Sequence, residues 1–218
     1  KIIMTFKSAL EIDCGIRYMF ESLEIISPCG RKMLLGSEMM TAKREVDYYY
    51  SKLNEIYYKD CSRIANKLMC LKDIQTTLTR LDEGAVLDDI ELFEVKYLAI
   101  VSQEVLKLLE ELKIKAVRLP DVGEVVKILD PDGLNIPSFY VYDSYCDELR
   151  VIRKQMRALQ GEGEALSEEQ RMELAALLQR NADLELEARM KLSAQLRGFA
   201  ADLPLALRNH PFLDILVA

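Results

Sequence analysis

The chain has 218 residues, of which 50% are apolar and 30% are charged, and its formal net charge is −7 at pH 7. This composition excludes a disordered chain and is sufficient for a sizeable hydrophobic core. The negative charge argues against nucleic-acid binding by the chain as a whole, because such binding neutralises phosphates, but it is compatible with a local basic face.

The first predicted helix covers residues 9–26. Its apolar residues recur at spacings of three and four, which places them on one stripe of a helix. They are Ala9, Ile12, Ile16, Met19, Leu23 and Ile26. The stretch "SPCG" then ends the helix, because Pro28 has no N–H to donate and Gly30 can turn.

A second helix is predicted over residues 42–60 and carries tyrosines at 48–50 and 57–58. Their helical spacing favours rings packed around a core stripe, with the hydroxyl groups in water. The alternative is an exposed platform on which nucleic-acid bases stack.

The clearest helix lies within residues 88–114 and follows a turn at Gly84. Asp88 is predicted to cap its N-terminus, and Glu91, three residues later, to reach back in a capping box.

Residues 128–142 are predicted to form a β-hairpin. The segments "EVVKIL" and "SFYVYDSY" are rich in β-branched and aromatic residues, and "DPDGLN" between them has turn chemistry. A calcium loop is excluded because, counted from Asp130, Gly133 is fourth rather than sixth and Val141 takes the place of the glutamate ligand. The stretch is therefore predicted to be a corner and not a metal site.

Residues 143–203 are predicted to form an antiparallel helical hairpin. One seam runs through Leu149, Ile152, Met156 and Leu159, and Ser167 is predicted to cap the second helix. The second seam comprises Leu174, Leu177, Asn181, Leu184 and Ala188, continued by Leu192, Leu196, Phe199 and Leu203. Asn181 on this seam would fix the register of the two helices at some cost in stability.

Four cations lie at helical spacing on the first hairpin helix and are the candidate DNA-binding residues. They are Arg150, Arg153, Lys154 and Arg157. Because they project from one face, they could follow a phosphate backbone. The alternative is a solvated flank that pairs with acidic residues of the partner helix, namely Glu168, Glu169 and Glu173.

Motifs for catalysis and metal binding are missing. The sequence has no phosphate-binding G-K loop, no G-x-S-x-G and no H-E-x-x-H. Its only histidine, His210, precedes Pro211 and is interpreted as a turn residue. The five cysteines form no C-x-x-C pair, which predicts free thiols in a reducing, cytoplasmic compartment. We therefore expect no catalytic residue, metal or cofactor in this chain; an unrecognised enzyme would need a pocket with convergent polar groups.

No apolar run approaches the roughly 20 residues of a membrane helix, and the first residues lack the features of a signal peptide, so no membrane contact is expected. Together the elements predict a mainly α protein: a multi-helix bundle with a small β-hairpin and a long antiparallel helical hairpin.

The order of these elements resembles the non-ATPase part of MutS-family DNA mismatch repair and recombination proteins, closest to the branch that lacks the mismatch-recognition domain. Four stretches carry the resemblance. They are "ALEIDCGIRYMFESLEIISPCGRKML", "LTRLDEGAVLDDIELFEVKYLAIVSQEVLKLLEEL", "ILDPDGLNIPSFYVYDSYCDELRVIRK" and "FLDILVA". The first keeps Ser27, Pro28, Gly30 and Arg31 in the family's order. The sequence departs from the family in lacking the Phe-x-Glu wedge and a nucleotide-binding domain.

The resemblance implies four regions: a helical lever or core domain at 1–127, a hairpin connector at 128–142, a coiled-coil clamp arm at 143–203 and a truncated helix at 204–218 that returns to the core. It further implies that ATP and magnesium bind a C-terminal domain that follows Ala218 in a bacterial, nucleoid-associated homodimer. The clamp would contact the backbone of double-stranded or branched DNA, weakly for this chain alone. A competing hypothesis is a helical scaffold that docks a protein partner through its coiled-coil hairpin.

Overall fold

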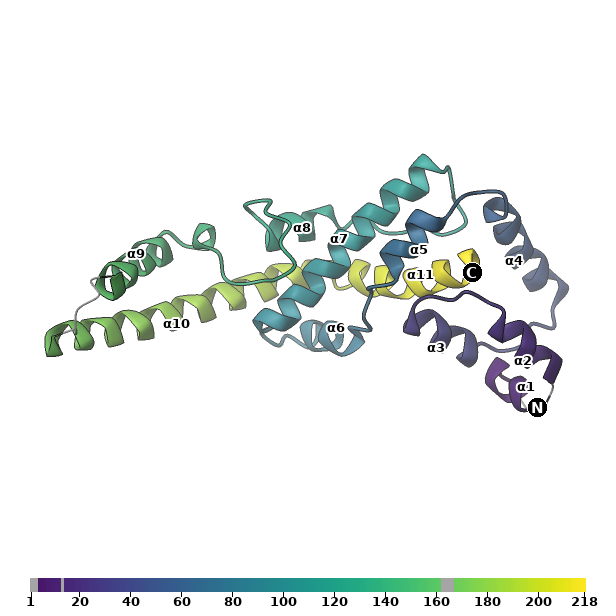
Figure 1. Ribbon diagram of the computed structural model, residues 1–218, viewed down its shortest axis with the longest axis horizontal. Helices are drawn as coiled ribbons and strands as arrows, with labels where there is room; N and C mark the ends of the chain where they lie inside the picture. Colours follow the sequence, from purple (N-terminus) through teal and green to yellow (C-terminus); the bar gives the residue numbers. More distant parts are fainter. Residues whose placement is uncertain (1–3, 13, 162–166) are drawn as a thin grey trace. The chain divides into compact units, whose positions relative to one another are not determined.

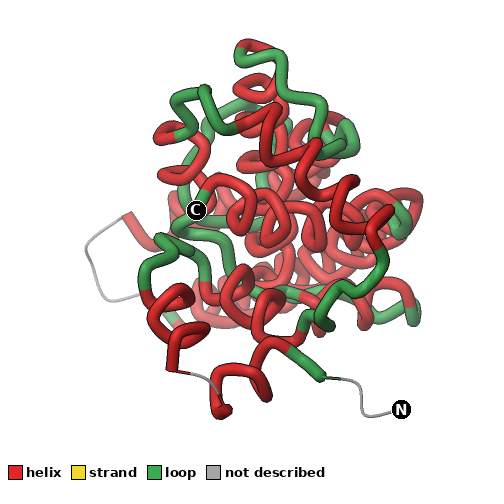
Figure 2. The backbone as a smooth tube through the Cα atoms, turned by 90° about the vertical axis from the view of Figure 1, so that its right-hand side faces the viewer, coloured by secondary structure: helices red, strands yellow, loops and turns green. Residues whose placement is uncertain are grey.

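The structure is a computed structural model that describes residues 4–12, 14–161 and 167–218 (Figure 1). The described residues form eleven α-helices, two 3-10 turns and one isolated bridge between Thr5 and Glu38, so Figure 2 draws them as helix and loop. The predicted mainly α fold is confirmed. Within the described part of the chain, no helix is both long and apolar enough to cross a membrane.

The chain divides into two compact units, and each is described by itself. The first unit comprises the described residues of 1–75, 97–123 and 201–218. Its helices are α1 (Phe6–Ile12), α2 (Cys14–Glu21), α3 (Pro28–Gly36), α4 (Lys43–Ile56), α5 (Ser62–Leu68), the later part of α7 (Asp89–Glu111) and α11 (Asp202–Val217).

The second unit comprises the described residues of 76–96 and 124–200. It holds most of α6 (Gln75–Asp82), the beginning of α7, most of α8 (Gly123–Leu129), η1 (Asp143–Tyr145), α9 (Asp147–Gly161), α10 (Glu168–Leu196) and η2 (Arg197–Phe199). Whereas the resemblance implied one continuous domain over 1–127, the structure shares α7 between the units. A long helix with apolar residues along its whole length can contribute to two cores.

The first unit is organised by α11, which packs against α3, α4 and α5 (Figure 1). The carboxylate of Asp214 on α11 is 1% exposed and accepts hydrogen bonds from the start of α3. Its Oδ2 accepts from the backbone N–H and the hydroxyl of Ser27, at 2.8 and 2.6 Å, and its Oδ1 accepts from the N–H of Ile26 at 3.2 Å. A buried carboxylate is stabilised at a helix N-terminus because the unpaired N–H groups and the helix dipole both favour negative charge.

The stretch "SPCG" therefore begins a helix, and does not only end one. Ser27 is the N-cap of α3, since its hydroxyl accepts from the N–H of Gly30 at 2.9 Å, and Pro28 occupies the first helical position, where no N–H is needed. The single helix predicted over 9–26 is replaced by α1 and α2, which end at Ile12 and Glu21. Helical spacing alone did not reveal that Ile12 would be 75% exposed.

Gly30 allows the close approach of α3 and α11. A Cβ atom at this position would lie 2.4 Å from Oδ2 of Asp214 and 2.9 Å from a side-chain carbon of Ile25. Neither neighbour can move away easily, because Asp214 holds three hydrogen bonds and Ile25 is 4% exposed. At Gly36, the other end of the same helix, an added Cβ atom would meet nothing within 4 Å.

The interpretation of His210 as a turn residue is wrong. His210 and Pro211 both lie inside α11, and the imidazole is 2% exposed with its Nε2 2.8 Å from the hydroxyl oxygen of Ser102 on α7. The Ser102 hydroxyl donates to the carbonyl of Leu98 at 2.7 Å, so it accepts from Nε2–H of a neutral imidazole. The Nδ1 atom is buried and has no partner among the described residues. Burial of this neutral ring lowers the pKa of His210 to about 4.

The second unit contains the two predicted turns and the predicted cap of α7. Asp88 Oδ1 accepts from the N–H of Glu91 at 2.8 Å, and Glu91 Oε2 accepts from the N–H of Asp88 at 3.0 Å, which confirms the capping box. Gly84 has φ of 91° and Gly133 has φ of 63°, values that favour glycine. "DPDG" is thus a corner, as predicted.

The corner belongs to a helix and a loop, so the predicted β-hairpin is wrong. "EVVKIL" lies in α8, where Val125 and Leu129 are both 0% exposed. Their i, i+4 spacing puts them on one buried helical face, which outweighs the weak strand preference of β-branched residues. "SFYVY" forms neither a helix nor a strand, and instead buries Val141 and Tyr142.

Buried polar groups fasten this loop. The Asp130 carboxylate accepts from the N–H groups of Leu134 and Asn135 at 3.2 and 2.8 Å and lies 3.5 Å from Nζ of Lys96. The Lys96 side chain is fully buried and donates to the Tyr142 hydroxyl at 3.1 Å. The loop thereby obtains from side chains the polar partners that a strand would obtain from a sheet.

We predict that Gly30→Ala lowers the free energy of unfolding by about 2 kcal/mol, because the added methyl group overpacks the contact with Asp214. The matched control Gly36→Ala should be neutral or stabilising by up to about 1 kcal/mol, since alanine favours a helix where space is open. Chemical denaturation followed by circular dichroism measures both. Equal effects of the two substitutions would show that the approach of α3 to α11 does not require glycine.

We also predict that stability falls as the pH drops from the ordinary histidine pKa of 6.5 towards 4, because the unfolded chain binds a proton that folded His210 does not. The expected loss is about 2–3 kcal/mol across this interval. His210 is the only histidine, so His210→Gln should remove the loss. Chemical denaturation at several pH values gives the free energy of unfolding of the parent chain and of His210→Gln. If the difference between these two free energies did not change with pH, the prediction would be contradicted.

Candidate nucleic-acid interface

The two helices of the predicted clamp arm, α9 and α10, pack against each other in the second unit (Figure 1). On α9, Leu149 and Ile152 of the predicted seam are buried. On α10, the buried residues include Leu184, Ala188, Leu192 and Leu196, all of which were assigned to the seam. Ser167 caps α10, as predicted, and does so in a full capping box with Gln170.

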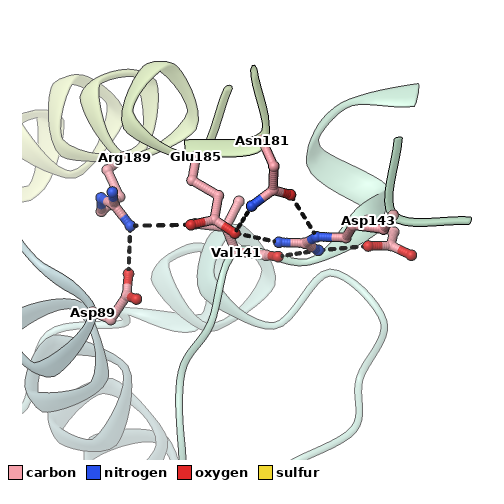
Figure 3. Close-up of polar contacts among 7 residues, drawn as sticks. Asp89, Val141, Asp143, Asn181, Glu185 and Arg189 are labelled. Carbon is pink, nitrogen blue, oxygen red and sulfur yellow. Dashed lines mark hydrogen bonds and ion pairs between the residues drawn. The ribbon is translucent and has the colours of Figure 1, made fainter. Parts of the chain in front are cut away.

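Arg153, one of the four candidate DNA-binding cations, lies in an internal polar network of this unit. Figure 3 shows the contacts, which join α9 and α10 to the segment that precedes α9. The Arg153 guanidinium donates to the Val141 carbonyl at 2.7 Å, to Asp143 at 2.5 Å, to Asn181 at 3.2 Å and to Glu185 at 2.8 Å. Its side chain is 20% exposed. These contacts engage four of its five N–H donors inside the unit, so Arg153 is a positioning residue.

This network sets two guanidinium groups against three carboxylates. Burial opposes the charge on Arg153, but its hydrogen bonds with Asp143 and Glu185 outweigh burial and raise the pKa of the guanidinium. Glu185 also accepts from the side-chain amide of Asn181 at 2.8 Å and lies 4.0 Å from Arg189, which in turn lies 3.2 Å from Asp89 on α7. The network therefore ties α9, α10 and the first residues of α7 together, with Asn181 in the register-setting place that its seam position predicted.

The other three candidate cations are exposed on α9. Arg150 is 63% exposed and lies 4.0 Å from Asp147, a separation at the limit of an ion pair. Arg157 donates from Nε to the Arg153 carbonyl at 3.2 Å, which leaves the remaining guanidinium donors in water. For the exposed Lys154, no ion pair or hydrogen bond is found among the described residues. We call Arg150, Lys154 and Arg157 the basic stripe.

The observed ion pairs between α9 and α10 differ from those expected if the cations of α9 formed a solvated flank paired with α10. Among the ion pairs of the described residues, none joins α9 to Glu168, Glu169 or Glu173. Instead Arg180 of α10 makes a two-pronged contact with Glu148 of α9, at 2.7 and 2.9 Å. The stripe therefore keeps its positive charge exposed.

Sequence reasoning missed the network partners of Arg153. Asp143 lies ten residues before Arg153, and Glu185 lies on the other helix, so neither follows from helical spacing. The available signal was Asn181, a polar residue at a seam position that requires hydrogen-bond partners. Nothing in the described part of the chain groups three or more His, Cys, Asp or Glu side chains as a metal would need.

We predict that Arg153→Ala lowers the free energy of unfolding by about 1–3 kcal/mol, because it leaves Asp143 and Glu185 partly buried without a counter-charge. Arg157→Ala is the matched control on the same helix and should change it by less than about 0.5 kcal/mol. Denaturant midpoints of the two variants and of the parent chain measure both changes in stability. If Arg153→Ala were as mild as Arg157→Ala, the network would not stabilise the clamp arm.

The chain was also compared with known proteins. A scan against protein-family models found no family that matches, and a search of curated proteins returned no match either.

Proposed function

We propose that this chain is the non-catalytic lever and clamp portion of a MutS-like DNA repair ATPase, and that it binds DNA backbone through the clamp. The observation that carries the proposal is the contact of Asp214 with Ser27 and Ile26. It joins the first and the last of the four stretches that resemble the family. The bonded residues, Ser27 in "SPCGRKML" and Asp214 in "FLDILVA", are 187 residues apart in the sequence. A buried contact between the very residues on which a resemblance rests supports a shared core.

In the proposed mechanism the two described units have different tasks. The first unit, with its core of α3, α5, α7 and α11, would transmit movement from an ATPase domain that the chain itself does not contain. The second unit would hold DNA with α9. Because α7 contributes to both units, it is the element best suited to carry such movement.

DNA binding is assigned to the basic stripe formed by Arg150, Lys154 and Arg157. Three cations at spacings of four and three follow one side of α9, and a phosphate backbone can be contacted in this way without reading bases. Arg153, between them, holds α9 against α10 and so fixes where the stripe lies. Affinity should be modest and sensitive to salt, because three contacts release few counterions and α10 begins with Glu168 and Glu169.

The test is DNA binding by the full chain at low salt, measured by fluorescence anisotropy with duplex and branched DNA. Replacing Arg150, Lys154 and Arg157 by Glu should weaken binding by at least about tenfold and lower the slope of affinity against salt. The matched control replaces three exposed lysines of the first unit, Lys7, Lys43 and Lys107, by Glu and makes the same change in net charge. Equal losses in the two variants, or no binding by the parent chain, would refute the assignment to the stripe.

The alternative is a helical scaffold that docks a protein partner. It is favoured by apolar side chains exposed on α10, away from its seam: Met172, Leu186 and Met190 lie within about 40° of one another around the helix and are between 49% and 70% exposed. Large exposed apolar residues that share a helix face mark interaction sites. A chain that ignores DNA at low salt but retains a partner through these residues, and loses it on substitution by Ser, would establish the scaffold.

A further inference from the structure

A hollow in the first unit combines exposed cations with aromatic rings, and the clamp proposal does not use it. Its volume is about 350 Å³, near the lower end for small-molecule sites. Its walls come from α4, from the segment that follows α7 and from α11. Of the described residues that line it, three are cations and none is acidic. The cations are Lys52, Lys115 and Arg118, and the rings are Tyr48 and Phe212.

The rings are held in place by Lys52. Its ammonium nitrogen lies 4.7 Å from the ring centre of Tyr48 and 6.0 Å from that of Phe212, and it donates to the carbonyl of Ala116. Tyr49 packs edge-on against both rings, with centroids 5.3 Å from Tyr48 and 5.9 Å from Phe212. Lys52 therefore positions the aromatic wall and adds charge to it.

The predicted packing of the tyrosines around a core is wrong for this wall, because Tyr48 is 56% exposed. A ring that is positioned by neighbours yet open to solvent is what a stacking surface requires. A second hollow, of about 580 Å³, shares Tyr48 and is lined also by Tyr49, Met39 and Met40 together with the charged residues Glu38, Arg44 and Glu45. Thioether and aromatic side chains of this kind suit a flat, polarisable ring.

The segment that follows α7 supplies the charge. Lys115 and Arg118 are exposed, and neither side chain has an ion pair in the described part of the chain. The carboxylate of Glu55 accepts from the backbone N–H of Lys115, and Asn209 of α11 donates to the Arg118 carbonyl at 2.7 Å, so the segment is fixed at both ends. Among the described residues no acceptor is found for the backbone N–H of Val117 or of Arg118. Two exposed cations without an ion pair, in a hollow that no described acidic residue lines, favour the binding of an anion.

We propose that this hollow binds the phosphate of a nucleotide through Lys115 and Arg118 and stacks its base on Tyr48. The ligand is either a free nucleotide or the phosphate-bearing end of a single strand, since both present the same chemistry. The site lies wholly in the first unit and does not depend on the basic stripe of α9.

Isothermal titration calorimetry of the full chain with deoxyadenosine monophosphate tests the proposal. Binding should be sub-millimolar and should weaken about tenfold or more in Tyr48→Leu and in the double variant Lys115→Glu, Arg118→Glu. Matched controls should bind like the parent: Tyr58→Leu, which removes a ring that is 91% exposed outside the hollow, and the double variant Lys7→Glu, Lys107→Glu. If Tyr48→Leu does not fold, the substitutions Lys115→Gln and Arg118→Gln at exposed positions keep the test decisive.

Two further probes distinguish a free nucleotide from a strand end as the ligand, and base stacking from phosphate binding alone. If strand ends are the ligand, a short oligodeoxyadenylate with a terminal phosphate should bind more tightly than the mononucleotide. If free nucleotides are the ligand, it should bind no more tightly. Either result supports the site, provided that the same variants weaken the binding. Inorganic phosphate alone should bind more weakly, so equal affinity for phosphate would overturn the stacking role of Tyr48. Absence of binding at millimolar nucleotide would overturn the site. The variant that lacks Arg150, Lys154 and Arg157 should bind the nucleotide normally, whatever it does to duplex DNA.

Discussion

The first unit depends on one buried carboxylate. Asp214 would be costly to bury alone, and it is stabilised only where several donors converge on it. The beginning of α3 offers them, and Gly30 lets the two helices approach closely enough to use them. Once α11 is held in this way, it brings His210 to Ser102 and places Phe212 beside α4. The core and the hollow lined by Tyr48 and Phe212 therefore rest on the same contact.

The second unit uses charges for a comparable purpose. Its segment between α8 and α9 has no strand partner, yet it buries Val141 and Tyr142. Lys96 and Arg153 supply hydrogen bonds to this segment from fixed helices, and their acidic partners neutralise them. Buried ion pairs of this kind add little net stability, but removing one member is costly, so they specify one arrangement of the loop.

The balance of charges also bears on function. The chain has 29 lysines and arginines against 36 acidic residues, and several of the cations are consumed by internal pairs. Among the cations that remain exposed, two groups are local: the basic stripe on α9 and the pair Lys115 and Arg118 beside Tyr48. A negatively charged chain can thus present small positive surfaces, on which both proposals rest, although the chain as a whole would be repelled by a polyanion.

The sequence alone determined most of the helices, the caps at Asp88 and Ser167, the turns at Gly84 and Gly133 and the seam between α9 and α10. These features depend on residues within about one or two turns of each other, so spacing and local chemistry suffice to predict them. It did not determine that "EVVKIL" is helical, that His210 is buried, that Arg153 faces inward or that Tyr48 stays exposed. Each of these depends on partners far away in the chain: the buried face under α8, Ser102 on α7, Glu185 on α10 and the segment around Ala116. Only tertiary structure decides which distant groups meet, because local periodicity selects a helix face without naming what will cover it.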